Sequence, residues 1–170
     1  LMFYGGLIAA SGTLAVYARY TGQKLFEVTD LILAVVPLGH ALGRIGCFCH
    51  GCCYGRITKS ALGVCFPKFS PAWWEEVNAV PPLISQNAAQ SLPVIPTQLI
   101  EACANLFLFV VLYLLYPRVH KRLGRVTGLY LMGYAVIRFG GEYLRGDPRM
   151  SVGPFSIGQT ISIVLFLFGA

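Results

Sequence analysis

Long apolar stretches separated by short polar segments are the feature that most limits how this chain can fold. The predominantly apolar stretches are residues 1–18, 25–42, 97–116, 127–144 and 157–170. A helix needs about 20 residues to cross a bilayer, and it satisfies its own backbone hydrogen bonds there. The chain is 56% apolar and only 12% charged, about half the charged fraction of ordinary globular domains. The sequence therefore predicts an all-α, polytopic membrane protein with about five spans.

The two ends of the chain indicate a longer protein. Leu1 stands inside one apolar stretch and Ala170 inside another. We therefore expect residues 1–170 to form a single transmembrane domain, the ordered part of a protein with about seven spans.

Residues 57–96 differ from the rest in composition. Six prolines fall between positions 67 and 96, together with the pair Trp73–Trp74. Prolines at this density exclude a spanning helix. We expect an extramembrane excursion on the outer side, with the tryptophans at the level of the lipid headgroups.

The positive charges predict the orientation in the membrane. Arg19 and Lys24 lie an even number of expected spans away from the basic cluster at 118–125. Basic loops favour the cytoplasmic side, so the excursion lies outside. The net charge of +6 is dispersed among loops, and nucleic acid is not an expected partner.

The segment 38–56 contains the least ordinary chemistry. Four of the six cysteines and two of the three histidines lie in it, and Arg44 follows an apolar run. We expect Pro37 to kink the preceding helix, and the closely spaced glycines to turn the chain.

A second polar group lies in the fourth apolar stretch. Arg138, Glu142 and Arg145 are spaced by four and three residues, which places them on one helical face. One interpretation is an Arg138–Glu142 pair, with Arg145 reaching the outer headgroups. The other is a site for an anionic lipid headgroup, to which Arg44 adds a guanidinium that can bind phosphate bidentately.

The cysteines leave three interpretations open. Cys49 and Cys52 form a C-x-x-C pair suited to redox chemistry. A zinc site from Cys47, Cys49, Cys52 and His50 is the second, although its spacing is tight. The third is that they are small packing residues at a turn. We assign no metal and no cofactor from the sequence.

Two further polar residues are candidates for the site, and a third is assigned a structural role. His40 precedes Arg44 by one helical turn and could act as a base beside a phosphate. Tyr4 offers a hydroxyl at membrane depth. Asp30, near the cytoplasmic end, is interpreted as a cap or loop partner and not as a catalyst.

Four ordered motifs resemble those of the prolipoprotein diacylglyceryl transferase family over nearly the whole chain. The motifs are Gly5-Gly6-Leu7-Ile8, then Gly43-Arg44-Ile45-Gly46-x-Phe48-x-x-Gly51-x-x-Tyr54-Gly55, then Pro96-Thr97-Gln98-Leu99-Ile100-Glu101, and last Arg138-Phe139-x-x-Glu142-x-x-Arg145 followed by Ser156-x-Gly158-Gln159.

The resemblance implies an enzyme of the bacterial inner membrane with its site open to the outer leaflet. It implies transfer of a diacylglyceryl group from phosphatidylglycerol to the lipobox cysteine of a preprolipoprotein signal peptide. Arg44 and Arg138 would hold the phosphate, and Glu142 would orient Arg138. Binding of substrate and membrane lipids is expected to involve Gly5, Gly6, Gly43, Gln98, Arg145 and Gln159.

The sequence also departs from the family at three polar positions. Tyr4 stands where the family usually has His, Cys47 where it has Asn, and Cys52 where it has Glu. His40 could replace the missing histidine. Two alternative functions follow: a non-catalytic lipid-binding subunit of a membrane complex, and an outer-face thiol oxidoreductase.

Overall fold

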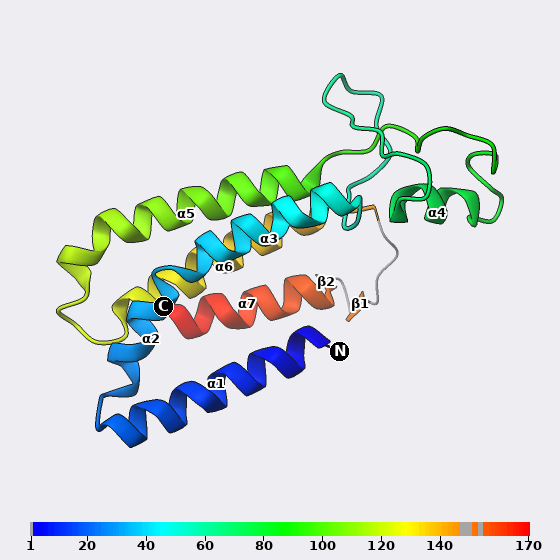
Figure 1. Ribbon diagram of the computed structural model, residues 1–170. Coiled ribbons are helices and arrows are strands. Elements are labelled where there is room, and N and C mark those ends of the chain that lie inside the picture. Colours follow the sequence, from blue (N-terminus) through cyan, green and yellow to red (C-terminus); the bar gives the residue numbers. More distant parts are fainter. Residues whose placement is uncertain (1, 147–150, 153–154) are drawn as a thin grey trace.

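The protein is built mainly of helices (Figure 1). The computed structural model describes residues 2–146, 151–152 and 155–170. The helices are α1 (Met2–Thr21), α2 (Leu25–Leu33), α3 (Val36–His50), α4 (Pro71–Val77), α5 (Thr97–Val119), α6 (Arg125–Leu144) and α7 (Ile157–Gly169). Strands β1 (Ser151–Val152) and β2 (Phe155–Ser156) form a small antiparallel pair. The helical class predicted from the sequence is confirmed.

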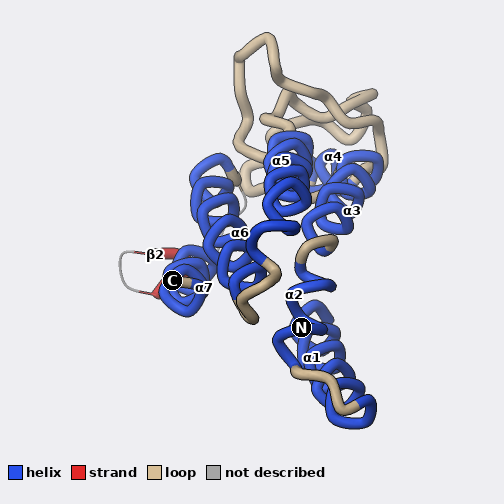
Figure 2. The backbone as a smooth tube through the Cα atoms, turned by 90° about the vertical axis from the view of Figure 1, so that its left-hand side faces the viewer, coloured by secondary structure: helices blue, strands red, loops and turns tan. Residues whose placement is uncertain are grey.

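Four helices pack side by side and form the body of the fold. Helix α5 packs against α3 and α6, and α6 packs against α7. Helix α1 packs against α2 and extends away from the others, as the end-on view shows (Figure 2). The carboxyl ends of α3 and α6 and the amino ends of α5 and α7 lie at the end of the bundle that carries α4 (Figure 1).

Within the described residues, α5 is the helix whose length and composition suffice to cross a membrane. Helices α2 and α3 together also suffice if they are counted as one span bent by 41°. The larger number of spans expected from the sequence stays a prediction.

The break between α2 and α3 confirms the predicted proline kink. Helix α2 ends at Leu33, and Pro37 lies in the first turn of α3, where its missing N–H costs no hydrogen bond. The predicted turn at the closely spaced glycines begins later than expected. Helix α3 continues through Gly43 and Gly46 to His50, and the chain turns only at Gly51, whose φ is +76°.

Residues 57–96 form loops around α4 and contain a small core of their own. Phe66, Ala72 and Val94 are buried together, and the Trp73 indole N–H donates to the Ala88 carbonyl at 2.9 Å. Trp73 is only 2% exposed, so its expected place among lipid headgroups is wrong, because it fills the interior of the excursion instead. Trp74 is exposed. The extramembrane location of this segment stays a prediction.

Glu76 is a buried acid beside this small core. Its Oε2 accepts the Leu92 N–H at 2.8 Å, and its Oε1 has no hydrogen-bond partner in the described part of the chain. Burial raises the pKa of Glu76 above its usual value, and the Leu92 hydrogen bond offsets part of that rise. Folding therefore favours the protonated acid, and this contribution is complete at low pH and lost as pH rises through the raised pKa.

We expect Glu76→Gln to weaken the pH dependence of stability, because glutamine keeps an acceptor for Leu92 and carries no charge. The melting temperature, followed by tryptophan fluorescence, should fall less for the variant than for the native protein between about pH 5 and about pH 8. Identical pH profiles for the two proteins would contradict this account.

Asp30 joins α2 to the start of α6. One carboxylate oxygen accepts the Gly124 N–H at 2.8 Å, and the other accepts the Thr127 N–H at 2.8 Å and its hydroxyl at 2.6 Å. These N–H groups belong to the first turn of α6, which has no acceptor of its own within the helix. The prediction that Asp30 is a cap and loop partner is confirmed.

Replacing Asp30 by alanine should lower the free energy of unfolding by about 2 kcal/mol, because two backbone N–H groups and a hydroxyl lose a charged acceptor. Unfolding in mixed micelles titrated with a denaturing detergent measures the change. Glu27→Ala serves as the control, since Glu27 is an exposed acid of the same helix. Equal losses in the two variants would show that the cap has no special role.

Candidate active site

Three helices contribute charged side chains to one cluster. Arg44 Nη2, from α3, lies 2.6 Å from Glu101 Oε2 of α5. Arg138 Nη1, from α6, lies 3.8 Å from Glu101 Oε1, and Arg138 Nη2 lies 3.3 Å from Glu142 Oε2. The structure therefore brings Arg44 and Arg138 together, while their chemical role stays a prediction.

Glu101 is the member of the cluster that sequence reasoning missed. It appears in the third family motif, yet its position alone was a signal, because it is the single acidic residue of the very apolar helix α5. A carboxylate in such a helix needs a cation or a hydrogen bond to offset its desolvation. It finds two guanidinium groups, from helices distant in the sequence.

The exposure of the cluster is uneven. The Glu101 and Glu142 side chains are each 5% exposed, whereas those of Arg44 and Arg138 are 22% and 19% exposed. The two carboxylates are therefore buried, whereas the two arginine side chains that they bind remain partly exposed to solvent. Arg138 Nη1 is itself buried and makes no hydrogen bond within the described residues, although it lies near Glu101. Guanidinium groups presented this way suit a phosphate or another oxyanion.

Two glycines allow the carboxylates to reach their positions. A Cβ at Gly141 of α6 would lie 2.9 Å from Glu101 Oε1, and one at Gly158 of α7 would lie 2.9 Å from Glu142 Oε2. The Ser156 hydroxyl also donates to Glu142 Oε1 at 2.9 Å. The geometry of the cluster therefore depends on small residues that lie against the acids.

Arg145 does not continue the helical face of Arg138 and Glu142. Helix α6 ends at Leu144, and Arg145 is extended, with φ −77° and ψ 143°. Its side chain is buried and hydrogen-bonds the Cys53 side chain. The interpretation in which Arg145 reaches outer headgroups is therefore wrong, because the helix ends one residue too early and the side chain turns inward.

Side chains at the start of α5 hydrogen-bond the backbone of the turn after α3 and hold it in place. The Gln98 amide donates to the Cys52 carbonyl at 2.8 Å, and the Thr97 hydroxyl donates to the Cys53 carbonyl at 2.9 Å. Gln98 is fully buried, so its present contact is with the turn. Its expected role in substrate binding stays a prediction. Cys53 has a φ of +62°, which is uncommon for a residue with a side chain.

Gly55 fixes the other end of the turn. A Cβ there would lie 2.6 Å from the Leu144 carbonyl oxygen and 2.7 Å from Thr97 Cγ2. The Gly55 N–H donates to the Ile95 carbonyl at 2.8 Å. The turn is therefore packed, backbone against backbone, between the start of α5 and the end of α6.

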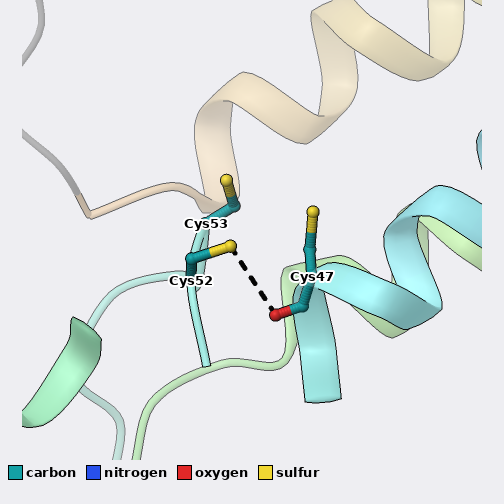
Figure 3. A group of neighbouring side chains, drawn as sticks. All are labelled: Cys47, Cys52 and Cys53. Carbon is teal, nitrogen blue, oxygen red and sulfur yellow. Dashed lines mark hydrogen bonds between the residues drawn. The ribbon is translucent and has the colours of Figure 1, made fainter. Parts of the chain in front are cut away.

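Three cysteines of this segment lie together (Figure 3). The sulfur atoms of Cys47, Cys52 and Cys53 are all within 4.8 Å of one another. Cys49 is exposed and is not a member of the group. The structure thus groups Cys52 with Cys47 and Cys53, which differs from the C-x-x-C pair and from the zinc set considered from the sequence.

The two turn cysteines differ in acidity. Burial, with the neighbouring thiols Cys53 and Cys47, raises the pKa of Cys52 to about 12. Burial also acts to raise the pKa of Cys53, but the hydrogen bond and charge of Arg145 and the charge of Arg44 outweigh it and lower that pKa.

His40 lies against two tyrosines of α6. Its ring centroid is 5.1 Å from that of Tyr134 and 6.4 Å from that of Tyr130. Its Nδ1 is buried and has no hydrogen-bond partner in the part of the chain that the structure describes. His40 stands one turn before Arg44 on α3, and its use as a base stays a prediction.

The other predicted site residues lie at varied places. Gly43 faces open space on α3. Gln159 forms a reciprocal cap with Ser156 at the start of α7. Tyr4, Gly5 and Gly6 belong to α1, and their side-chain surroundings lie outside the described part of the structure. The binding or catalytic roles expected for these residues stay predictions.

Together these features define a helical bundle in which two arginines from separate helices cluster around buried carboxylates. The chain belongs to the prolipoprotein diacylglyceryl transferase family, whose sequence profile matches residues 1–170.

Named relatives of this chain come from several bacteria. It is 33% identical over 168 residues to the phosphatidylglycerol–prolipoprotein diacylglyceryl transferase of Clostridium tetani, covering 99% of this chain and 61% of the relative. It is 35% identical over 162 residues to the protein of that name from Methylibium petroleiphilum, covering 95% and 54%. The second such transferase of Clostridium perfringens is 32% identical over 168 residues, covering 99% and 59%. The chain thus spans somewhat over half the length of these relatives.

Glu101→Ala should lower the free energy of unfolding by about 3 kcal/mol, because Arg44 and Arg138 would lose their shared carboxylate inside the bundle. Unfolding in mixed micelles measures the loss. Glu101→Gln keeps the size and a polar acceptor, so its loss should be smaller. An alanine variant as stable as the native protein would mean that Glu101 does not hold the arginines.

Proposed function

We propose that this chain holds the headgroup site of a phosphatidylglycerol–prolipoprotein diacylglyceryl transferase. The enzyme would move the diacylglyceryl group from phosphatidylglycerol to the lipobox cysteine of a preprolipoprotein. One observation carries the proposal: Arg44 and Arg138, from separate helices, share Glu101 and remain partly exposed. The family and the names of the relatives support the same reaction.

The arginines would stabilise charge on the phosphate as its ester bond breaks. The acceptor thiol first loses its proton to a base or to solvent, and the resulting thiolate attacks the glycerol carbon that bears the phosphate ester, so that a C–S bond forms and the C–O bond breaks. The electron pair of that bond leaves on the phosphate oxygen of glycerol phosphate. Fixed guanidinium donors beside this oxygen are worth more in a dry pocket than in water.

The carboxylates would act as positioning residues. Glu101 contacts both arginines, and Glu142 contacts Arg138 while it accepts the Ser156 hydroxyl. Three guanidinium groups, counting Arg145, outnumber two carboxylates in this region, so it keeps one net positive charge. That balance favours an anionic lipid over a neutral one.

An apolar groove beside the cluster suits an acyl chain. Helices α6 and α7 enclose about 410 Å³, and Phe139, next to Arg138 in sequence, lines this space. Its other walls are almost entirely apolar and include Ala135, Ile163 and Phe166. We propose that the acyl chain of a lipid bound at the arginines lies in this groove.

The proposed location is the bacterial inner membrane, with several spans and the site toward the outer leaflet. In Figure 1 the α1–α2 turn and the α5–α6 loop, which carry basic residues, lie at one end of the bundle. The segment with α4 lies at the opposite end. Basic loops favour the cytoplasmic face, which supports the outward direction of the other end.

Arg44→Ala and Arg138→Ala should each abolish measurable transfer of labelled lipid to a lipobox peptide, because the phosphate loses a bidentate donor. The lysine variants keep the charge and should retain a small part of the rate. Arg19→Ala, at an exposed arginine of α1, should leave transfer unchanged. Full activity of both alanine variants would defeat the proposal. Native protein that transfers no lipid but co-purifies with other membrane proteins would favour the non-catalytic alternative.

Two helical glycines offer a test of carboxylate positioning. A Cβ at Gly141 would displace Glu101 Oε1, whereas a Cβ at the exposed Gly12 of α1 meets nothing within 4 Å. We expect Gly141→Ala to lower the rate of transfer about tenfold or more, because it moves the shared carboxylate, and Gly12→Ala to leave it near the native value. Unfolding of both variants should be followed in parallel. Equal rates in the two variants would show that the position of Glu101 does not matter for transfer.

A further inference from the structure

Three thiols converge where α3 ends and the following turn begins. Cys47 comes from the last turn of α3, and Cys52 and Cys53 come from the turn itself. Their sulfur atoms lie within 4.8 Å of one another (Figure 3). The Cys52 thiol also lies 3.7 Å from the Cys47 carbonyl oxygen. All three residues are only partly buried.

We propose that Cys47, Cys52 and Cys53 bind a thiophilic divalent metal ion, zinc above all, and leave one coordination position open for the acceptor thiol. The second half of this inference rests on the proposed transferase function, whereas the metal site itself does not. Zinc bound by three protein ligands and one exchangeable ligand is a common arrangement of catalytic sites.

The distances suit such a site. Zinc–sulfur bonds of about 2.3 Å at tetrahedral angles place sulfur atoms about 3.8 Å apart. The three sulfurs need to close by roughly 1 Å or less to reach that spacing. Rotation of the Cys52 and Cys53 side chains can supply this movement. Their backbone stays in place because Gln98 and Thr97 donate hydrogen bonds to their carbonyl oxygens.

The surrounding charges also suit it. Three thiolates around a divalent ion carry one net negative charge. Arg145 hydrogen-bonds the Cys53 side chain, and Arg44 precedes Cys47 by one turn on the same face of α3. Arginines in these positions stabilise thiolates. Among the thiols of the described residues, the exposed Cys49 and Cys103 stand outside the group.

An open position here would serve the chemistry of transfer. An ordinary cysteine thiol has a pKa of about 8.5, so most of it is protonated at neutral pH and only the thiolate attacks carbon. Coordination releases the thiol proton to solvent and keeps the sulfur as a thiolate. That sulfur then forms the C–S bond while the C–O bond to phosphate breaks, and the glycerol phosphate leaves with the electron pair. The arginine cluster and the thiol group would thus hold the two reactants side by side.

The metal site is tested without reference to activity. Full-length protein, reduced and kept free of oxygen in detergent, is titrated with Co²⁺, whose thiolate complexes absorb strongly. We expect one equivalent to bind with thiolate charge-transfer bands, and Zn²⁺ to displace it. Cys47→Ser, Cys52→Ser and Cys53→Ser should each weaken binding by more than about tenfold. Cys49→Ser and Cys103→Ser are the matched controls and should bind as the native protein does.

Two results would overturn the metal site. One is absence of thiolate bands in native protein that melts normally. The other is a disulfide among Cys47, Cys52 and Cys53 when thiols are trapped by alkylation before the cells are opened, which would assign the group to redox chemistry. Because both are binding or mass measurements, neither depends on whether the protein transfers lipid.

The open position is tested by adding a lipobox peptide to the Co²⁺-loaded protein. The peptide with cysteine should change the cobalt spectrum, and the same peptide with serine should not. No difference between the two peptides would overturn the acceptor role. If the spectrum changes but Zn²⁺-loaded protein transfers no diacylglyceryl group in the presence of phosphatidylglycerol, the metal site stands and the proposed transferase function fails.

Discussion

One carboxylate, that of Glu101, organises the polar interior of this bundle. Two guanidinium groups from α3 and α6 approach it from different sides. Charges in an apolar surrounding are costly unless they are paired, so the three side chains depend on one another for their burial. The contact of α5 with α6 is therefore electrostatic near Glu101 and apolar further along the helix, where Leu108 and Leu112 are buried against α6.

Small residues recur around the cluster and the turn beside it. Gly141 and Gly158 leave room for the oxygens of Glu101 and Glu142, and Gly55 lets the turn after α3 approach the end of α6. Each would be crowded by a single added carbon. The positions of the charged groups therefore depend on the absence of side chains at the neighbouring glycines as well as on the ion pairs themselves.

Sequence reasoning reached the parts of this arrangement that depend on local pattern. Apolar stretches located the main helices, Pro37 located the break before α3, and the place of Asp30 in the chain indicated a cap. It did not identify Glu101 as the link between Arg44 and Arg138, because the link depends on which helices are neighbours. Arg145 was misplaced for a related reason: helical spacing holds only while the helix lasts, and α6 ends at Leu144.

The cysteines show the same limit. The C-x-x-C spacing made a Cys49–Cys52 pair one of three open interpretations, yet helix α3 runs to His50 and leaves Cys49 exposed. The left-handed backbone at Gly51 and Cys53 then brings Cys52 and Cys53 back toward Cys47. Such a reversal depends on tertiary contacts with Thr97 and Gln98, which no local rule in the sequence contains.

The base of the 57–96 segment is closed by backbone pairing. Both Ile57 and Val64 pair with the fully buried Val94, while the side chain of Val80, near the middle of the segment, is 98% exposed. A protease that cuts beside Val80 would therefore leave two fragments that remain held together by the backbone pairing at Val94. The turn beside the arginine cluster would keep its shape in such a nicked molecule, and the two pieces would separate only when the whole bundle unfolds.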